Sequence, residues 1–353
     1  MDRPYPDMPV STGGHGYASY RDTGWDALLA PRAAPLWAVI DGVNCRDVAQ
    51  RVQGDMVQST CLYTSTDADT RAMAPWLVRV DPDGPVARWL ADLAQDQHWG
   101  VLVQSEASIH QLRMHLRKFT MLWTPANEES PVYFRFYDPR VAVDMVDAIE
   151  PWKLDRFFAK IGRLIAPMSA QVLLPTGADL AQPPALDATE ESYRGRLVAI
   201  TPTEPPRDDG GASRSFRIGQ PEFARFGALQ KRRSQLKMAQ ELLVPFPECT
   251  PGETLEAVEA AGDLGARHAM TSVRQVHTLA RCFLEFGMGF PQGYRDAAHI
   301  LDDTQSAPWR KSKLLEAWIP RGRVRRDMLT RLEDEEESFE AVIQSNRTAR
   351  AAQ

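Results

Sequence analysis

The sequence lacks features that define several large classes of protein. Its four cysteines, spread over 353 residues, include no CxxC pair, which argues against a cysteine-based metal site and favours a reduced, cytoplasmic protein with structural thiols. No apolar run approaches the ~20 residues needed to span a bilayer. The N-terminus has early Asp and Pro residues and no apolar stretch typical of a signal peptide. The sequence therefore predicts no membrane span, and residues 1–30 are predicted to be a disordered tail.

Motifs of the common enzyme classes are also missing. The sequence has no GxxxxGK[ST] phosphate loop, no GxSxG elbow and no HExxH among its seven histidines. The segment "GMGFPQG" (287–293) has the wrong glycine spacing for dinucleotide binding and follows a helical pattern, so Gly287 is predicted to end a helix. His115 lies beside an apolar stripe and is predicted to be structural. The net charge of −6 argues against a nucleic-acid partner, and the sequence predicts no cofactor and no metal.

Short apolar runs alternate with helical patterns from about Pro35 to Pro167, which predicts one α/β domain over residues 31–167. This alternation favours parallel strand pairs in a mixed sheet covered by helices. The last two strands flank a polar loop and are predicted to form a hairpin. Ser105 is the predicted N-cap of the helix that follows it. The predicted strands cover residues 35–41, 59–64, 74–81, 99–105, 119–124 and 132–137.

The composition changes after Pro167. Residues 168–219 are rich in Pro, Gly, Asp and Ser, and are predicted to form an irregular linker with short strands. From Gln220 onward the pattern is helical, so residues 220–353 are predicted to form a helical lobe. The predicted fold class is an α/β mixed-sheet N-terminal lobe followed by an α-helical C-terminal lobe. The predicted helices cover residues 220–243, 252–262, 266–286, 293–302, 308–318 and 323–349.

The stretch "YFRFYDPR" (133–140) raises the question of a site. A strand over its first half would place Arg135 on an aromatic face, where a buried guanidinium needs a carboxylate. Asp138 is well placed to cap the next helix, with Pro139 at its first position. Arg140 then falls in the first turn, where the helix dipole disfavours a cation unless an acidic group pairs with it.

Asp41 ends the first predicted strand and is the candidate partner for Arg135 or Arg140. An enzymatic alternative is a hydrolase or transferase that uses the strand-end carboxylates Asp41 and Asp138, because α/β active sites gather at strand ends. No nucleophile, phosphate loop or metal set accompanies these carboxylates, so an architectural role is favoured and no catalytic residue is predicted.

Two charged segments are candidate partner-binding faces. "QKRRSQLK" (230–237) is basic, and residues 321–337 change from basic to acidic, a pattern that suits electrostatic docking to another protein. The same charges could equally be solvated helix faces, and the sequence leaves both readings open. The candidate partner-binding residues are Lys231, Arg232, Arg233, Lys237, Arg325, Arg326, Glu335 and Glu336.

The order of the motifs "WAVIDG", "CLYTS", "APWLVRVDPDGPVARWL", "WGVLVQSEASIHQLRMHLRKF", "VYFRFYDPRV" and "LDRFFAKIG" resembles the domain of unknown function 4123 over about residues 35–165. The resemblance implies a non-enzymatic adaptor chaperone that binds a type VI secretion effector in the cytoplasm. It further implies that the adaptor promotes loading of the effector onto the VgrG spike protein, and that a helical lobe follows the domain. The family-type positions are Trp99, Gly100, His115, Arg117, Arg135, Tyr137, Asp138, Pro139 and Arg140.

Overall fold

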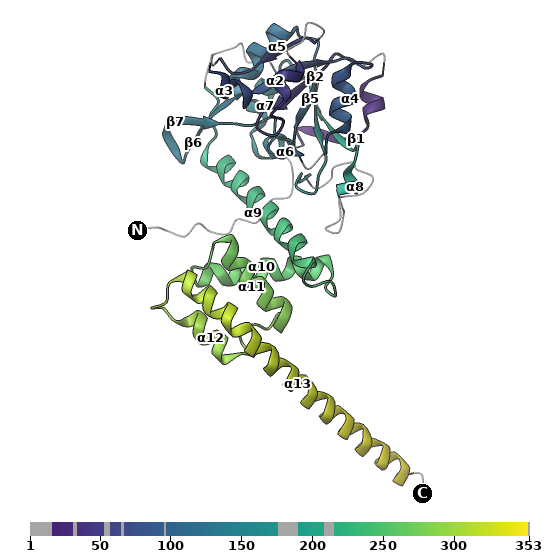
Figure 1. Ribbon diagram of the computed structural model, residues 1–353, viewed down its shortest axis with the longest axis vertical. Helices are drawn as coiled ribbons and strands as arrows, with labels where there is room; N and C mark the ends of the chain where they lie inside the picture. The colour runs from purple at the N-terminus through teal and green to yellow at the C-terminus, as the bar shows by residue number, and fades with distance from the viewer. Residues whose placement is uncertain are drawn as a thin grey trace. The chain divides into compact units, whose positions relative to one another are not determined.

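The chain is divided into two units. The computed structural model describes residues 16–30, 34–52, 57–64, 67–94, 97–175, 190–207 and 215–351. Unit 1 spans residues 1–233 and unit 2 spans residues 234–353 (Figure 1). An α/β unit followed by a helical unit confirms the predicted fold class. The boundary lies inside helix α9 (Gln220–Leu243), whose first part belongs to unit 1.

A seven-stranded sheet forms the centre of unit 1. Its strand order is β1-β9-β8-β5-β2-β4-β3, and every neighbouring pair in it is antiparallel. The strands are β1 (Ala18–Thr23), β2 (Leu36–Asp41), β3 (Ser59–Cys61), β4 (Pro75–Val80), β5 (Gly100–Gln104), β8 (Arg163–Pro167) and β9 (Leu197–Pro202).

The predicted parallel pairs were wrong, and the sheet order explains why. Strands β4 and β5 follow one another through helix α4 (Pro85–Asp92), and they run in the same direction because each is antiparallel to β2. Strand β2 lies between them, so they never become neighbours. A strand–helix–strand pattern thus reported the relative direction of two strands correctly, but it contained no information about the third strand inserted between them.

Helices cover both faces of the sheet. Residues alternate along β2, so that Trp37 and Val39 enter one core while Ala38 and Ile40 enter the other. The first core is closed by α5 (Ile109–Leu116), α6 (Pro139–Ala148) and α7 (Pro151–Phe158). The second is closed by α1 (Trp25–Leu28), α2 (Val48–Val52) and α4. Among the described residues, unit 1 also contains the short elements α3 (Ala68–Ala72), η2 (Arg117–Phe119) and α8 (Glu190–Tyr193).

Two predicted irregular regions contribute strands to the sheet. Strand β1 lies within the predicted tail and pairs with β9 from Ala18 to Thr23, so the tail prediction was wrong for this part of the chain. Residues 1–15 lie outside the described residues. Strand β9 lies within the predicted linker and occupies an inner position between β1 and β8, with Val198 and Ile200 fully buried. Strands β1 and β9 are far apart in the sequence, and β1 joins the sheet by pairing with β9.

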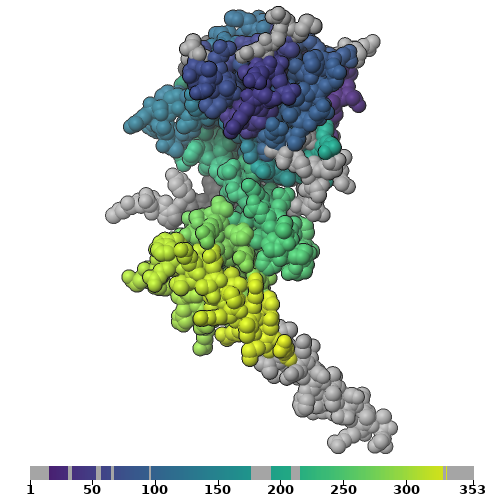
Figure 2. Space-filling view, viewed as in Figure 1, coloured from purple at the N-terminus to yellow at the C-terminus, as the bar shows by residue number. Residues whose placement is uncertain are grey.

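The predicted hairpin is confirmed, but its second strand is displaced. Strands β6 (Met121–Thr124) and β7 (Asn127–Tyr133) pair with each other and project from the side of unit 1 (Figure 1, Figure 2). Strand β7 ends at Tyr133, so the predicted strand 132–137 was wrong over residues 134–137. The chain turns at this point instead, because the backbone N–H of Asp138 donates to Arg135 O over 2.8 Å.

Unit 2 is helical in its described part. Its members after α9 are α10 (Pro251–Arg267), α11 (Val273–Phe286), α12 (Arg295–Asp302) and α13 (Pro308–Ala351). Gly287 has a φ of 85° and its N–H bonds to Phe283 O, which confirms its predicted place at a helix end. Among the residues described, no helix combines the length and apolar character needed to cross a bilayer.

Helix α13 joins two helices that the sequence separated at Pro320. Proline within a helix removes one backbone hydrogen bond. Buried Trp318 and Ile319 hold the helix before this point, and Arg323 pairs with the buried Glu285 of α11 after it, with Nε 2.5 Å from Oε2. These tertiary contacts keep helix α13 continuous across Pro320.

Candidate functional site

The strand-end carboxylate Asp41 lies in a buried ion pair. Arg135 donates from Nη2 to Asp41 Oδ2, and the backbone N–H of Val43 donates to Oδ1 over 3.0 Å. The Asp41 side chain is fully buried, whereas that of Arg135 is 35% exposed. Burial raises the pKa of Asp41 above its ordinary value, and the Arg135 guanidinium opposes that rise. The predicted Asp41–Arg135 pair is therefore present, and it lies inside the fold.

Asp138 caps helix α6, as predicted. Its Oδ1 accepts from the backbone N–H of Arg140 over 3.0 Å, and Pro139 occupies the first helical position. The Arg140 side chain folds back onto the same carboxylate, with Nη2 2.7 Å from Oδ2, and also donates to Gln171. Burial alone would raise the pKa of Asp138, but its contacts with Arg140 outweigh burial and hold the pKa below its ordinary value.

A histidine and a serine that the sequence did not single out lie beside this cap. His98 Nε2 is 3.0 Å from Ser169 Oγ, and His98 is close enough to Asp138 to lower the pKa of that carboxyl. His98 has a φ of 49°, a strained conformation for a residue with a side chain. His98, Ser169 and Asp138 thus gather three residue types that hydrolases use.

The burial of this group favours an architectural role. Ser169 is 1% exposed, and its Oγ also accepts from the backbone N–H of Gln171. Asp138 directs both carboxylate oxygens at Arg140, whereas a hydrolase needs its carboxylate to orient the histidine. The enzymatic alternative built on Asp41 and Asp138 requires carboxylates that a substrate can reach, and both are buried in ion pairs.

Trp99 and Gly100 hold the sheet around Asp41. The backbone N–H of Asp41 donates to Trp99 O over 2.8 Å, and the buried Trp99 ring stacks on Trp25. A Cβ on Gly100 would approach Val39 O to 2.2 Å, so only glycine allows β5 to lie this close to β2. The structure brings these family-type positions into the same neighbourhood as Arg135.

The remaining family-type positions have separate roles. Tyr137 OH lies 3.2 Å from Tyr63 OH, and burial raises the pKa of Tyr137. His115 is buried, its Nε2 donates to Phe157 O over 2.7 Å, and burial lowers its pKa. Arg117 is half-buried and its side chain forms no ion pair within the described part of the chain. His115 and Arg117 therefore lie apart from the Asp41 network.

One residue proposed from the sequence as a partner contact is buried. Arg233 donates twice to Asp144 at 2.7 Å and once to Gln171 O at 2.8 Å, so its placement on an exposed binding face was wrong. Burial raises the pKa of Asp144 to about 6, although Arg233 opposes the rise. Asp144 lies among buried apolar residues of α6, and a carboxylate on an apolar helix face was a signal that a cation must pack against it.

The other candidate partner residues differ in exposure. Lys231, Arg232 and Lys237 are exposed on α9, and Arg325 is exposed on α13. Arg326 is half-buried and donates to Glu285 O over 2.9 Å, so part of its role lies within unit 2. The side chains of Glu335 and Glu336 lie outside the described part.

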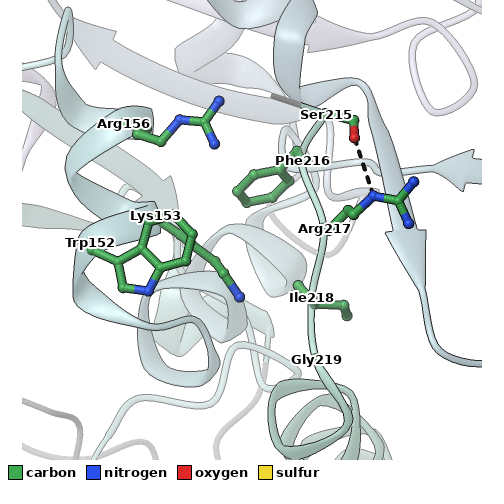
Figure 3. A pocket seen from close by; sticks show the side chains of 8 residues that line it. All are labelled: Trp152, Lys153, Arg156, Ser215, Phe216, Arg217, Ile218 and Gly219. Carbon is green, nitrogen blue, oxygen red and sulfur yellow. Dashed lines mark hydrogen bonds between the residues drawn. The ribbon is translucent and has the colours of Figure 1, made fainter. Parts of the chain in front are cut away.

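A pocket of about 590 Å³ lies on unit 1 between α7 and residues 215–219 (Figure 3). Arg156 extends from α7 toward Phe216, Lys153 extends toward Ile218, and Trp152 is 53% exposed (Figure 3). Lys153 is neutralised by the buried Glu222, with Nζ 2.6 Å from Oε2. The pocket therefore combines an aromatic face with cationic side chains.

Comparisons with known proteins find a family model that is similar to part of unit 1. No curated protein and no solved structure matches the chain. All ten residues assigned above to the Asp41 network and the family-type positions lie between residues 36 and 156. Residues 36–156, about a third of the chain, match the family described as "Domain of unknown function (DUF4123)".

Proposed function

We propose that this chain is a non-enzymatic adaptor chaperone that binds a type VI secretion effector in the cytoplasm and promotes its loading onto the VgrG spike protein. The observation that carries the proposal is that the family-type polar residues pair with one another inside unit 1. Arg135 pairs with Asp41 and Arg140 pairs with Asp138, and both carboxylates are buried. Residues held in this way stabilise a scaffold, and they leave partner recognition to the exposed surface.

The exposed cations of α9 are the proposed contact with the effector. Lys231, Arg232 and Lys237 are exposed on this helix, and Lys237 lies 3.9 Å from the exposed Glu241. A surface pair such as Lys237–Glu241 contributes little to folding, so its charges can engage another protein at small cost. A cationic face accelerates association with an acidic partner and fixes its orientation.

The experiment uses the full chain, because a deletion from residue 220 would remove Glu222 and Arg233 from unit 1. The products of the genes next to its own are co-expressed and captured with the tagged chain. Reversal of Lys231, Arg232 and Lys237 to glutamate should reduce effector capture about tenfold or more at low salt. The matched control reverses Arg21, Arg46 and Arg163, three exposed arginines of unit 1.

Two results would contradict the proposal in different ways. Equal capture by the wild-type chain and both reversed chains would show that the exposed cations of α9 are not the contact. Failure of the wild-type chain to capture either a toxin-like product or a spike protein would contradict the adaptor role itself.

A further inference from the structure

Helix α13 carries two stripes on different sides. One stripe, with Leu315, Trp318 and Ile319, is buried against the rest of unit 2. The other faces solvent and contains three large apolar side chains: Leu314 is 40% exposed, Val324 is 62% exposed and Met328 is 60% exposed. Exposed apolar residues are ordinary when scattered, but a repeated spacing along one helix is typical of a helix-pairing surface.

The exposed stripe has the spacing of a coiled coil. Steps of three and four residues connect its positions, and eight steps cover 28 residues, a mean of 3.5 residues per step. The side chains beyond Arg331 lie outside the described part, so their places follow from the sequence and from the helical backbone. The stripe positions are Leu314, Ala317, Arg321, Val324, Met328, Leu332, Glu335, Phe339 and Val342.

This series is symmetric about Met328. The steps read 3, 4, 3, 4 up to Met328 and 4, 3, 4, 3 after it. Two antiparallel copies of α13 that cross at Met328 therefore meet position by position. Leu314 then faces Val342, the small Ala317 faces the large Phe339, and Val324 faces Leu332. Small side chains opposite large ones fill a helix interface evenly.

Charge selects the antiparallel arrangement over the parallel one. The only charged stripe positions are Arg321 and Glu335, and an antiparallel pair places them opposite each other. A parallel pair would place Arg321 against Arg321 and Glu335 against Glu335, and like charges at an interface are repelled. The flanking sequence has the same polarity, because residues 321–326 carry four arginines and residues 333–337 are all acidic.

We propose that α13 is a dimerisation helix that pairs with a second copy of this chain in an antiparallel coiled coil centred on Met328. The paired segment from Leu314 to Val342 is 29 residues long, about 43 Å at 1.5 Å per residue. The series consists of two heptad-spaced runs that meet at Met328, where two steps of four follow each other, and together they have the length of a two-stranded coiled coil. The inference goes beyond the proposed function and does not depend on it.

The first test measures the mass of the full chain by sedimentation equilibrium at about 50 µM. The wild-type chain should be dimeric. Glu335→Arg should weaken the dimer about tenfold or more, because it places two arginines opposite each other. The double variant Arg321→Glu with Glu335→Arg should restore the dimer, since the pair is re-formed with its charges exchanged. A monomeric wild-type chain, or a double variant as weak as the single one, would overturn the proposal.

The second test fixes the direction of pairing. In a Cys249→Ser background, Met328→Cys should form a disulfide between copies under mild oxidation, because Met328 alone faces its own copy. Val324→Cys should not do so, since its opposite position is 332. The remaining native cysteines are buried and serve as a common background. Crosslinking of both variants to the same extent would indicate a parallel pair and would overturn the antiparallel assignment.

Discussion

The two units hold their helices in place by different means. Unit 1 uses buried ion pairs between residues far apart in the chain, such as Asp144 with Arg233 and Lys153 with Glu222. Unit 2 relies on apolar stripes and on capping boxes at Thr250 and Ser272. Its buried carboxylate Glu285 pairs with Arg323, whose side chain is half exposed.

This difference has an energetic consequence. A buried charge is costly unless its partner is present, so removal of one partner leaves a larger penalty than the pair itself contributes. A capping hydrogen bond at a solvated helix end can be replaced by water, and its loss costs less. Unit 1 should therefore respond more strongly to single polar substitutions than unit 2 does.

The largest expected effect is at Arg233. Arg233→Ala leaves the Asp144 carboxylate buried without its cation and should reduce the free energy of unfolding by about 3–5 kcal/mol near pH 8. Urea unfolding measures the change. Lys237→Ala, four residues further along α9 and 62% exposed, is the control and should stay within about 0.5 kcal/mol of wild type. Similar losses in both variants would remove the distinction between buried and exposed charges on α9.

The Arg233 effect should depend on pH. The pKa of Asp144 is about 6 in the folded chain against an ordinary value of 3.8, so the folded state binds the proton more tightly than the unfolded state. The stability that this group contributes is greatest at low pH, and it is lost as the pH rises from about 3.8 to about 6. Without Arg233 the folded pKa should rise further, so the difference between variant and wild type should shrink from pH 8 to pH 5. A difference that is constant with pH would mean that Asp144 does not carry the penalty.

A smaller loss is expected at Arg135. Arg135→Ala leaves Asp41 buried, but water can reach the space of a side chain that is 35% exposed, so we expect a loss of about 2–3 kcal/mol. Asp41→Asn in the same background should recover part of this loss, because no buried charge remains. Arg117→Ala is the control among the family-type positions, with an expected loss below about 1 kcal/mol. If Arg135→Ala with Asp41→Asn is no more stable than Arg135→Ala alone, the loss comes from packing of the Arg135 side chain and not from a buried charge.

The sequence predicted unit 2 better than the detail of unit 1, because the signals in unit 2 are local. Helix α9 has the predicted limits, and Gly287 ends α11 as expected, but α11 begins at Val273, so the predicted start at residue 266 was wrong. The predicted helix break at Pro320 was wrong for a tertiary reason, since packing on α11 holds α13 together there.

In unit 1, the predicted cap at Ser105 was also wrong: Ser108 caps α5, while the Ser105 hydroxyl donates to Lys160 O.

In unit 1 the sequence revealed single residues more readily than their partners. Asp138 as a cap and Asp41 as the partner of Arg135 were predictable, because a buried charge demands an opposite one and few candidates end a strand. Arg233 was read as exposed because its neighbours are basic, and its partner Asp144 is 89 residues away. The His98–Ser169 contact spans 71 residues and carries no local pattern.

The smallest expected effects compare one helix cap from each unit. Thr250→Ala removes the capping box of α10 at an exposed end and should cost about 0.5–1 kcal/mol. Asp138→Ala removes the cap of α6 and also frees Arg140, so it should cost about 1–2 kcal/mol. Hydrogen exchange of the first turns of both helices locates each loss, since a lost cap should increase exchange mainly in its own helix. If Thr250→Ala costs as much as Asp138→Ala, burial of the capping carboxylate adds nothing, and the contrast between the two units rests on the Asp144–Arg233 and Asp41–Arg135 pairs alone.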